Sequence, residues 1–298
     1  MSTRPPGAPL ATHGRFDYQP ITERPRFRWP NGGRLAVYFA LGLEQYHFGE
    51  GASENLVAGG AHPDVLNVSW REYGNRVGAW RLLECFSQHR LPVSILLNSA
   101  LCEHAPQLVR ACQAAGCELI AHGYSNSDTL SGLSEPQEAQ YLRQVATQMQ
   151  QFSGRAPAGW ASPWIAENPL TPDLLHESGY EYLLDWCMDD QPVWLRTRSG
   201  RILSVPYSQE LNDSSSIIGR QADAADFAAA IIDQFEELRQ GSDQPVVMSV
   251  VLHSFISGQP FRLRALRRAL EHVAQARDTL WLTQPGDIAR HYRSLNLA

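Results

Sequence analysis

The sequence predicts an α/β protein in which strands and helices alternate and the parallel strands close into a barrel. Seven or eight short apolar runs of strand length alternate with amphipathic helical patterns from about residue 33 onward. This alternating part spans ~250 residues, the usual size of one (β/α) barrel. We therefore expect the chain of 298 residues to form a single barrel domain over residues 33–298.

Residues 1–32 differ from the rest of the chain in composition and pattern. They are rich in proline, glycine and arginine and show no hydrophobic periodicity. Such a segment predicts an extended arm, which would wrap either the outside of the barrel or a neighbouring subunit.

The predicted strands are the apolar runs. The run Leu35–Leu43 is apolar throughout, as expected for a strand buried on both faces, and residues 246–252 repeat this pattern. The remaining runs are shorter but are bounded by turn residues. The predicted strands are residues 34–43, 93–97, 118–121, 159–162, 180–184, 202–205, 246–252 and 279–282.

The predicted helices follow from apolar spacing and from residues typical of helix ends. Gly116 ends one helix, and Ser134 followed by Pro136 and Gln137 begins another. The stretch 44–73 lacks a period, which predicts a lid or an interface element. The predicted helices are residues 73–89, 105–115, 135–152, 171–178, 224–239, 263–276 and 285–292.

Composition excludes several classes of function. The net charge of −6 and the scattered arginines argue against nucleic-acid binding, and the cluster Arg264, Arg267 and Arg268 is best interpreted as a solvated helix face. The five cysteines contain no Cys-x-x-Cys pair, so neither a disulfide framework nor a structural zinc site is expected. No apolar stretch approaches the ~20 residues of a membrane helix, and no secretory signal begins the chain. We expect a cytoplasmic protein.

Polar residues follow several predicted strands directly. Glu44 follows the first strand, His122 the third and His253 the seventh. Each alone could be a solvated strand end or a satisfied core residue. Because the carboxyl ends of barrel strands converge, the three together predict an acid/base site.

The segment that begins at His122 looks like a metal site that lacks one ligand. A second histidine four residues later could share an ion with His122, but Asn126 stands there, and an amide is a poor zinc ligand. Asp189 and Asp190 could form a simple turn or could contact a substrate, and both interpretations stay open.

These residues resemble motifs of the polysaccharide deacetylase (NodB-homology) superfamily. The resemblance covers roughly residues 33–293 and is strongest to the cytoplasmic branch of metal-independent allantoinases and cyclic imide hydrolases. It implies a distorted (β/α) barrel of seven or eight strands that hydrolyses a C–N amide bond. The motifs are Leu41-Gly42-Leu43-Glu44, His122-x-x-x-Asn126, Gly159-Trp160, Asp189-Asp190-x-Pro192 with Trp194, Val205-Pro206-Tyr207 with Asn212-Asp213, and Leu252-His253 followed by Gly258-x-Pro260-x-Arg262.

The resemblance also shows where this chain departs from the usual metal site. Typical polysaccharide deacetylases have an aspartate pair after the first strand and two histidines, whereas this chain has Glu44-Gln45 and Asn126. We therefore expect no cofactor. If a divalent metal is present, zinc is the expected ion, and Glu44 and His122 are its expected ligands, with His47 or His62 as a third.

The resulting hypothesis is an amidohydrolase that opens a small cyclic amide, imide or ureide by water attack on a ring carbonyl. Glu44 would act as general base, and His122 and His253 would stabilise the oxyanion and protonate the leaving nitrogen. Several aromatic residues favour a small planar ring. The predicted substrate contacts are Asn126, Trp160, Trp164, Asp189, Asp190, Tyr207, Asn212 and Arg262.

Two alternatives remain at this stage. One is a metal-dependent N-deacetylase of an amino sugar or peptidoglycan, which requires bound zinc. The other is a catalytically inactive barrel that binds a small ligand. In each case the expected partner is a small molecule, with no nucleic acid and no membrane, and the chain is expected to form a homo-oligomer, either a tetramer or a dimer.

Overall fold

The computed structural model describes residues 12–30, 32–59, 61–241 and 243–297. Their core is a nine-stranded sheet in the order β6-β7-β5-β4-β3-β2-β1-β8, with β9 paired to β1. Only β6 runs antiparallel to its neighbour. The strands are β1 (Leu35–Leu43), β2 (Ser94–Leu97), β3 (Leu119–Ala121), β4 (Gly159–Trp160), β5 (Tyr182–Leu183), β6 (Val193–Thr197), β7 (Gly200–Ser204), β8 (Val246–His253) and β9 (Trp281–Leu282).

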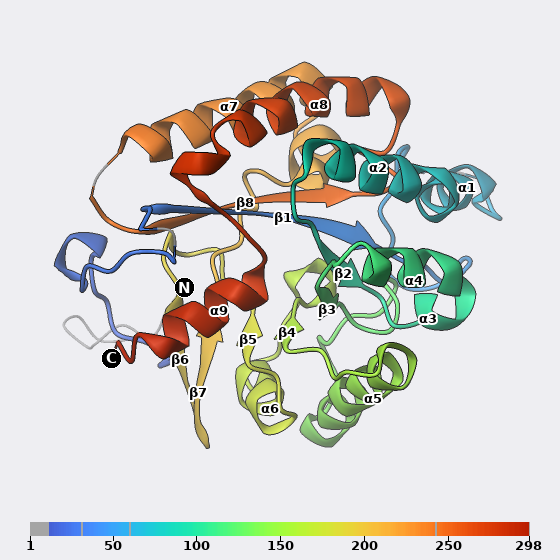
Figure 1. Ribbon diagram of the computed structural model, residues 1–298. Coiled ribbons are helices and arrows are strands. Elements are labelled where there is room, and N and C mark those ends of the chain that lie inside the picture. The colour runs from blue at the N-terminus through green and yellow to red at the C-terminus, as the bar shows by residue number, and fades with distance from the viewer. Residues whose placement is uncertain (1–11, 31, 60, 242, 298) are drawn as a thin grey trace, which may run out of the picture.

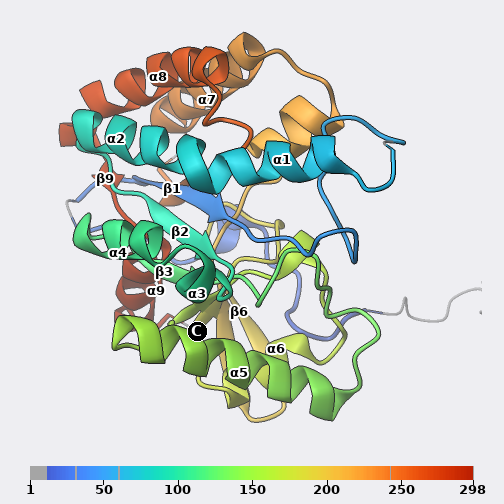
Figure 2. The same ribbon diagram turned by 90° about the vertical axis from the view of Figure 1, so that its right-hand side faces the viewer.

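Helices surround this curved sheet, and the predicted distorted (β/α) barrel is confirmed. Figures 1 and 2 both show α7, α8 and α2 on one side of β1, and α5, α6 and α9 on the other. The helices are α1 (Val65–Tyr73), α2 (Ala79–His89), α3 (Leu101–His104), α4 (Pro106–Ala114), α5 (Glu135–Ser153), α6 (Thr171–Glu177), α7 (Ala224–Gln240), α8 (Pro260–Gln275) and α9 (Pro285–Ser294), with the short turns η1 (Ile21–Glu23), η2 (Gly74–Gly78), η3 (Pro163–Ile165), η4 (Ser214–Gly219) and η5 (Arg277–Thr279).

Strand β1 lies between β2 and β8 in the sheet and positions two of the predicted site residues. All nine of its residues are buried, as its unbroken apolar sequence predicts. Its parallel register with β8 places Gly42 opposite His253, and Glu44 follows β1 directly. The carboxyl ends of both strands therefore bring Glu44 and His253 to the same edge of the barrel.

Two elements differ from the sequence expectations. The stretch 44–73, expected to lack regular structure, ends in α1, which continues through the π-helical turn η2 into α2. Residues 193–197, which were not predicted as a strand, form β6 in an antiparallel hairpin with β7. The predicted capping box at Ser134 and Gln137 is present at the start of α5.

The barrel is open along a seam between β8 and β6. Within the described residues no strand ladder joins these two edges of the sheet. Loop segments bridge them instead: the Val247 N–H donates to the Asp190 carbonyl (2.8 Å) and the Val251 N–H to the Leu211 carbonyl (2.9 Å). Side chains cross the seam as well, since Gln191 Nε2 donates to the Pro245 carbonyl and the Ser208 N–H to Ser249 Oγ, both at 2.7 Å.

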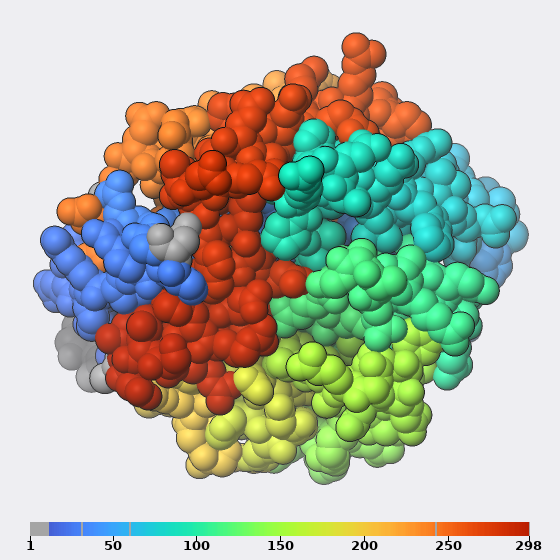
Figure 3. Space-filling model, in the orientation of Figure 1, coloured from blue at the N-terminus to red at the C-terminus, as the bar shows by residue number. Residues whose placement is uncertain are grey.

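Residues 12–30 of the predicted arm pack against the outside of the barrel near this seam. Trp29 is buried, and its indole N–H donates to the carbonyls of Arg34 (3.0 Å) and Val246 (3.1 Å). Phe27 packs edge to face on Tyr292 of α9. Figure 3 shows the blue N-terminal segment lying against the red C-terminal segment. Residues 1–11 of the predicted arm lie outside the described residues.

No helix within the described ranges has the length and apolar character needed to cross a bilayer. All five cysteines carry free thiols.

Candidate active site

Three predicted side chains meet at the carboxyl ends of β1, β3 and β8. The Glu44 Oε1 atom lies 3.6 Å from His122 Nε2 and 3.3 Å from His253 Nε2. The Glu44 side chain is only 1% exposed, whereas that of His253 is 13% exposed. A Cβ atom at Gly42 would lie 3.2 Å from both Glu44 Oε1 and His253 Cδ2, so the glycine leaves room for this approach. A ligand therefore meets the imidazole edges before it reaches the carboxylate.

Asp213 fixes the orientation of His253. Its Oδ1 atom lies 2.6 Å from His253 Nδ1, and the same carboxylate accepts from the His253 backbone N–H and from Ser257 Oγ (2.5 Å). Because a carboxylate only accepts, His253 Nδ1 carries a proton. The second nitrogen, Nε2, is thereby directed at Glu44.

His122 is oriented in a similar way by a backbone carbonyl. Its Nδ1 atom lies 2.8 Å from the Ala161 carbonyl oxygen, which can only accept, so Nδ1 carries a proton here as well. The Ala161 segment is itself held in place, since the N–H and Oγ of Ser162 both donate to Asp185 at 2.7 Å. Both imidazoles thus present Nε2 to one carboxylate oxygen.

The charges of Glu44 and His253 are coupled. Burial raises the pKa of Glu44, but His253 and His122 outweigh this effect and hold that pKa well below its ordinary value of 4.5. Burial lowers the pKa of His253, but Glu44 and Asp213 together raise it well above its ordinary 6.5. The site therefore holds a carboxylate and an imidazolium at neutral pH, a base and an acid in direct contact.

Tyr46 and Asn126 extend this network on the other side of Glu44. The Tyr46 hydroxyl donates to Glu44 Oε2 (2.5 Å), and Asn126 Nδ2 donates to the Tyr46 oxygen (3.1 Å). Arg71 lies over the Tyr46 ring, with its guanidinium carbon 4.7 Å from the ring centroid. Tyr46 was not among the predicted substrate contacts, yet it contacts the carboxylate directly.

The side chains present do not fit the zinc site of the resemblance. A catalytic zinc takes three protein ligands, but Asn126, in the place of the second histidine, directs its amide nitrogen to Tyr46. His47, considered as a replacement ligand, pairs with Asp128 at 3.5 Å, and His62 is exposed. Over the described ranges, no three His, Cys, Asp or Glu side chains are grouped so that they could hold a metal ion.

Among the predicted substrate contacts, Trp164 lies at the edge of the site and Trp160 does not. The Trp164 indole is 40% exposed and donates to the Asn126 backbone oxygen (2.8 Å). Trp160 is completely buried, packs edge to face on Tyr180 and donates to Ser162 Oγ (2.8 Å). Trp160 therefore supports the Ala161 segment and leaves no surface for a ligand.

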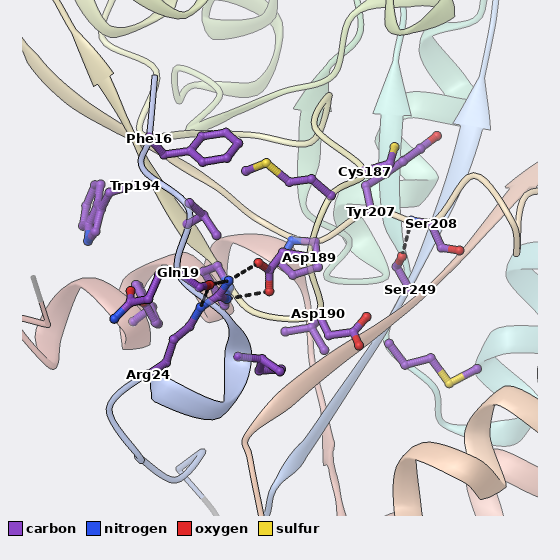
Figure 4. A pocket seen from close by; sticks show the side chains of 18 of the residues that line it. Phe16, Gln19, Arg24, Cys187, Asp189, Asp190, Trp194, Tyr207, Ser208 and Ser249 are labelled. Carbon is purple, nitrogen blue, oxygen red and sulfur yellow. Dashed lines mark hydrogen bonds and ion pairs between the residues drawn. The ribbon is translucent and has the colours of Figure 1, made fainter. Parts of the chain in front are cut away.

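Asp189, Asp190 and Tyr207 line a separate groove of about 1080 Å³ beside the seam. Figure 4 shows Arg24 of the arm directed at Asp189, and the two guanidinium contacts measure 2.6 and 2.5 Å. Tyr207 is buried at the inner side of this groove. The structure thus gives Asp189 a structural partner and separates it from the three catalytic candidates.

Asn212 and Arg262 lie next to Asp213. Asn212 Oδ1 accepts the Ser214 N–H (2.9 Å) and so holds the turn that carries Asp213. Arg262 is half-buried, stacks over the ring of Phe261 at 5.1 Å and lies close enough to Asp213 to interact with its charge. Both residues support the carboxylate that orients His253.

Sequence reasoning did not predict the role of Asp213. It was quoted only as part of a motif, because 40 residues separate it from His253 and nothing local indicates the contact. Asp185, which directly follows the predicted strand 180–184, likewise anchors Ser162. Their position after predicted strands was the only signal that could have identified them.

Comparison with known proteins finds a family model that matches the central part of the chain. Residues 72–183 match the family model described as polysaccharide deacetylase, and this range includes His122 and Asn126. Over these residues the chain is similar to polysaccharide deacetylase domains. The match ends before Asp213 and His253, which lie in the part of the barrel that completes the site.

Three known proteins resemble this chain over most of its length. A putative polysaccharide deacetylase of Schizosaccharomyces pombe is 26% identical over 91% of this chain and 93% of its own length. The crystal structure of a probable polysaccharide deacetylase from Pseudomonas aeruginosa PAO1 is 28% identical, with a TM-score of 0.77, over 90% of this chain and 94% of that one. The crystal structure of Puue allantoinase is 28% identical, with a TM-score of 0.78, over 94% of this chain and 99% of that one.

Proposed function

We propose that this protein hydrolyses a C–N bond in a small cyclic amide, imide or ureide. The observation that carries the proposal is the contact of Glu44 with His253, a carboxylate and an imidazolium 3.3 Å apart at a buried strand end. The family match and the likeness to a structure named as an allantoinase support a C–N hydrolase. The ring substrate is our own inference.

In the proposed reaction, water attacks a ring carbonyl and the ring C–N bond breaks. Glu44 accepts a proton from the attacking water, so that the new C–O bond forms as the carbonyl becomes an oxyanion. His253 stabilises this oxyanion through its Nε2–H and then delivers that proton to the leaving nitrogen. The products are a carboxylate and an N–H group on one opened chain.

His122 takes a narrower role in this scheme than the sequence predicted. The Ala161 carbonyl accepts from the His122 Nδ1 atom, so Nε2 is the nitrogen that faces the site, 3.6 Å from Glu44 Oε1. In the proposed scheme this nitrogen forms a hydrogen bond with the attacking water while Glu44 takes the proton of that water. We therefore assign His122 to the orientation of water next to Glu44.

A second candidate function is the N-deacetylation of an amino sugar. It is favoured by the names of the yeast and Pseudomonas relatives, both described as polysaccharide deacetylases. The same three side chains could attack an acetamido carbonyl. We rank it second because the side chains do not fit the three-ligand zinc site that the resemblance assigns to such enzymes.

A hydrolysis screen combined with metal analysis tests both candidates. Purified protein is assayed with hydantoin, allantoin, dihydrouracil, succinimide and chitobiose, with and without a chelator. We expect turnover of at least one ring in the presence of chelator, and a loss of about 10²- to 10⁴-fold in kcat for Glu44→Gln, with the ring still bound.

The other outcomes are equally informative. Stoichiometric zinc with activity that the chelator removes contradicts the proposed chemistry, and turnover of chitobiose alone supports the second candidate. Binding of a ring without any turnover supports the inactive barrel.

A further inference from the structure

The orientation of the Asn126 side chain follows from the charges around it. Glu44 is ionised and can only accept, so the Tyr46 hydroxyl must give its proton to Glu44 Oε2. The Tyr46 oxygen is then left with lone pairs only. The Asn126 atom that faces it at 3.1 Å must be the amide nitrogen, Nδ2, and the amide oxygen points away from Tyr46.

This amide oxygen has no partner in the described structure. Asn126 is buried, with 4% of its surface exposed, and its Oδ1 atom is buried and accepts no hydrogen bond. Leaving such an acceptor unsatisfied costs about 1 to 3 kcal/mol. An acceptor of fixed orientation beside the Glu44 network is therefore available to a ligand that brings a donor.

The backbone around Asn126 is held firmly on both sides. Its N–H donates to the Gln45 carbonyl (2.8 Å), and its own carbonyl accepts the Trp164 indole N–H (2.8 Å). Trp164 and Ile165 both adopt left-handed backbone conformations, with φ of 61° and 55°. Non-glycine residues in this region carry strain of ~1 to 3 kcal/mol each, and such strain concentrates at ligand sites. Here the two residues hold a partly exposed indole against the Asn126 backbone carbonyl.

We propose that Asn126 Oδ1 accepts a hydrogen bond from a ring N–H of the substrate. The inference rests on the proposed function and narrows its substrate class to rings with an unsubstituted N–H, namely imides and ureides. A ring with oxygen or an alkylated nitrogen in that position leaves Oδ1 unsatisfied and is discriminated against. Asn126 is then a specificity residue in place of a missing metal ligand.

The test combines altered substrates with altered enzyme. Oxazolidine-2,4-dione replaces one N–H of hydantoin with oxygen at nearly the same size, and 3-methylhydantoin removes the other N–H. Values of kcat/KM are measured for all three rings with the wild type and with Asn126→Leu, so that intrinsic ring reactivity cancels in the ratios. We expect Asn126→Leu to lower hydantoin turnover about 10- to 100-fold, and to leave one of the two analogues almost unaffected.

Two further variants separate hydrogen bonding from damage to the site. Asn126→Asp keeps an acceptor, so it should preserve the preference for hydantoin even if its overall rate falls. Asn75→Leu is a matched control, because Asn75 is also buried with an unpartnered Oδ1 and its Nδ2 donates to the Glu44 carbonyl (2.7 Å). It should lower turnover of all rings by one common factor.

The outcomes distinguish this inference from the proposed function. If Asn126→Leu slows hydantoin and both analogues equally, the function stands and the role of Asn126 is overturned. If the wild type opens no ring, the proposed function fails. In that case calorimetric titration with hydantoin decides the role of Asn126, since binding that Asn126→Leu leaves unchanged overturns it.

Discussion

At the scale of single residues, Glu44 and Asp213 together set the protonation state on which the proposed chemistry depends. Asp213 also contacts His253 at Nδ1 and at the backbone N–H, so it fixes the position of the ring. His253, with its raised pKa, contributes stability that is complete below pH 6.5 and is lost as the pH rises through the raised value. Glu44, with its lowered pKa, contributes stability that is complete above pH 4.5 and is lost as the pH falls. Between pH 4.5 and pH 6.5, Glu44 and His253 therefore both contribute fully to the stability of the folded protein.

The variant Asp213→Asn tests this dependence. The amide keeps the shape of the carboxylate but removes its charge, so the pKa of His253 should fall and the alkaline limb of the pH profile should move to lower pH. We expect kcat/KM at pH 8 to fall by about 10²-fold or more, because the general acid is deprotonated there. The measurement is the pH profile of kcat/KM. The control is Ser257→Ala, which removes another donor to Asp213 and should leave the alkaline limb of the pH profile nearly unchanged. If Asp213→Asn does not move this limb either, Asp213 does not raise the pKa of His253.

The residues that could be predicted from sequence are those that directly follow an apolar strand. Glu44 and His253 were found because β1 and β8 are continuous apolar runs whose ends converge. The amide of Asn126 was singled out because it replaced an expected histidine. Asp213 was not found, because its partner is defined by the fold and not by local spacing.

At the scale of elements, two glycines allow the backbone of the helical segment η2 to pack directly against the loop after β8. A Cβ atom at Gly78 would lie 2.0 Å from the Ser254 carbonyl oxygen, and one at Gly258 would lie 2.4 Å from the Gly78 Cα. The two backbones therefore cross in direct contact. Ser254 follows His253, so this crossing also helps to hold the His253 imidazole in place.

Substitution of Gly78 measures the importance of this crossing. In Gly78→Ala the backbones must separate, and overpacking of this kind costs about 1 to 3 kcal/mol. We expect a lower melting temperature and, because the loop after His253 shifts, a lower kcat. Gly219→Ala is the matched control, since its added Cβ would have only one neighbour, at an ordinary 3.6 Å. Equal melting temperatures for the two variants would contradict the close packing.

The helix α1 illustrates why one element could not be predicted. It buries Asn67 and Arg71 beside Trp70, while Val65 and Leu66 on the same helix are exposed. Because two of its three buried residues are polar, hydrophobic periodicity indicates no helix there. The buried polar groups act locally: Arg71 donates to the Glu54 carbonyl (2.6 Å), and Asn67 donates to the Val57 carbonyl (2.9 Å), which ties down the preceding loop.

At the scale of the whole molecule, the arm compensates for a barrel that does not close. The sheet ends at β6 and β8, and Arg24 and Trp29 of the arm contact residues on opposite sides of the seam, Asp189 and Val246. The arm could be predicted from composition, but its docking site could not, because no pattern in the sequence specifies which surface an extended segment covers. The expected homo-oligomer stays a prediction.

Removal of one arm contact tests this compensation. In Arg24→Ala, the partly buried Asp189 loses both of its guanidinium contacts, and we expect a loss of about 1 to 2 kcal/mol in the free energy of unfolding. The measurement is thermal or denaturant unfolding, with activity as a second readout. Asp17→Ala breaks the exposed pair with Arg196 and should leave the melting temperature almost unchanged. If the two variants lose similar amounts of unfolding free energy, the contact of Arg24 with Asp189 stabilises the seam no more than an exposed ion pair does.

The anchoring of Trp29 also constrains the order in which the molecule can assemble during synthesis. One of its two acceptors, the Val246 carbonyl, lies 217 residues further along the chain. A ribosome adding ~5 to 20 residues per second needs ~10 to 45 seconds to cover that distance. Throughout this interval the indole has no finished surface to cover, so a segment that is made early is among the last to dock.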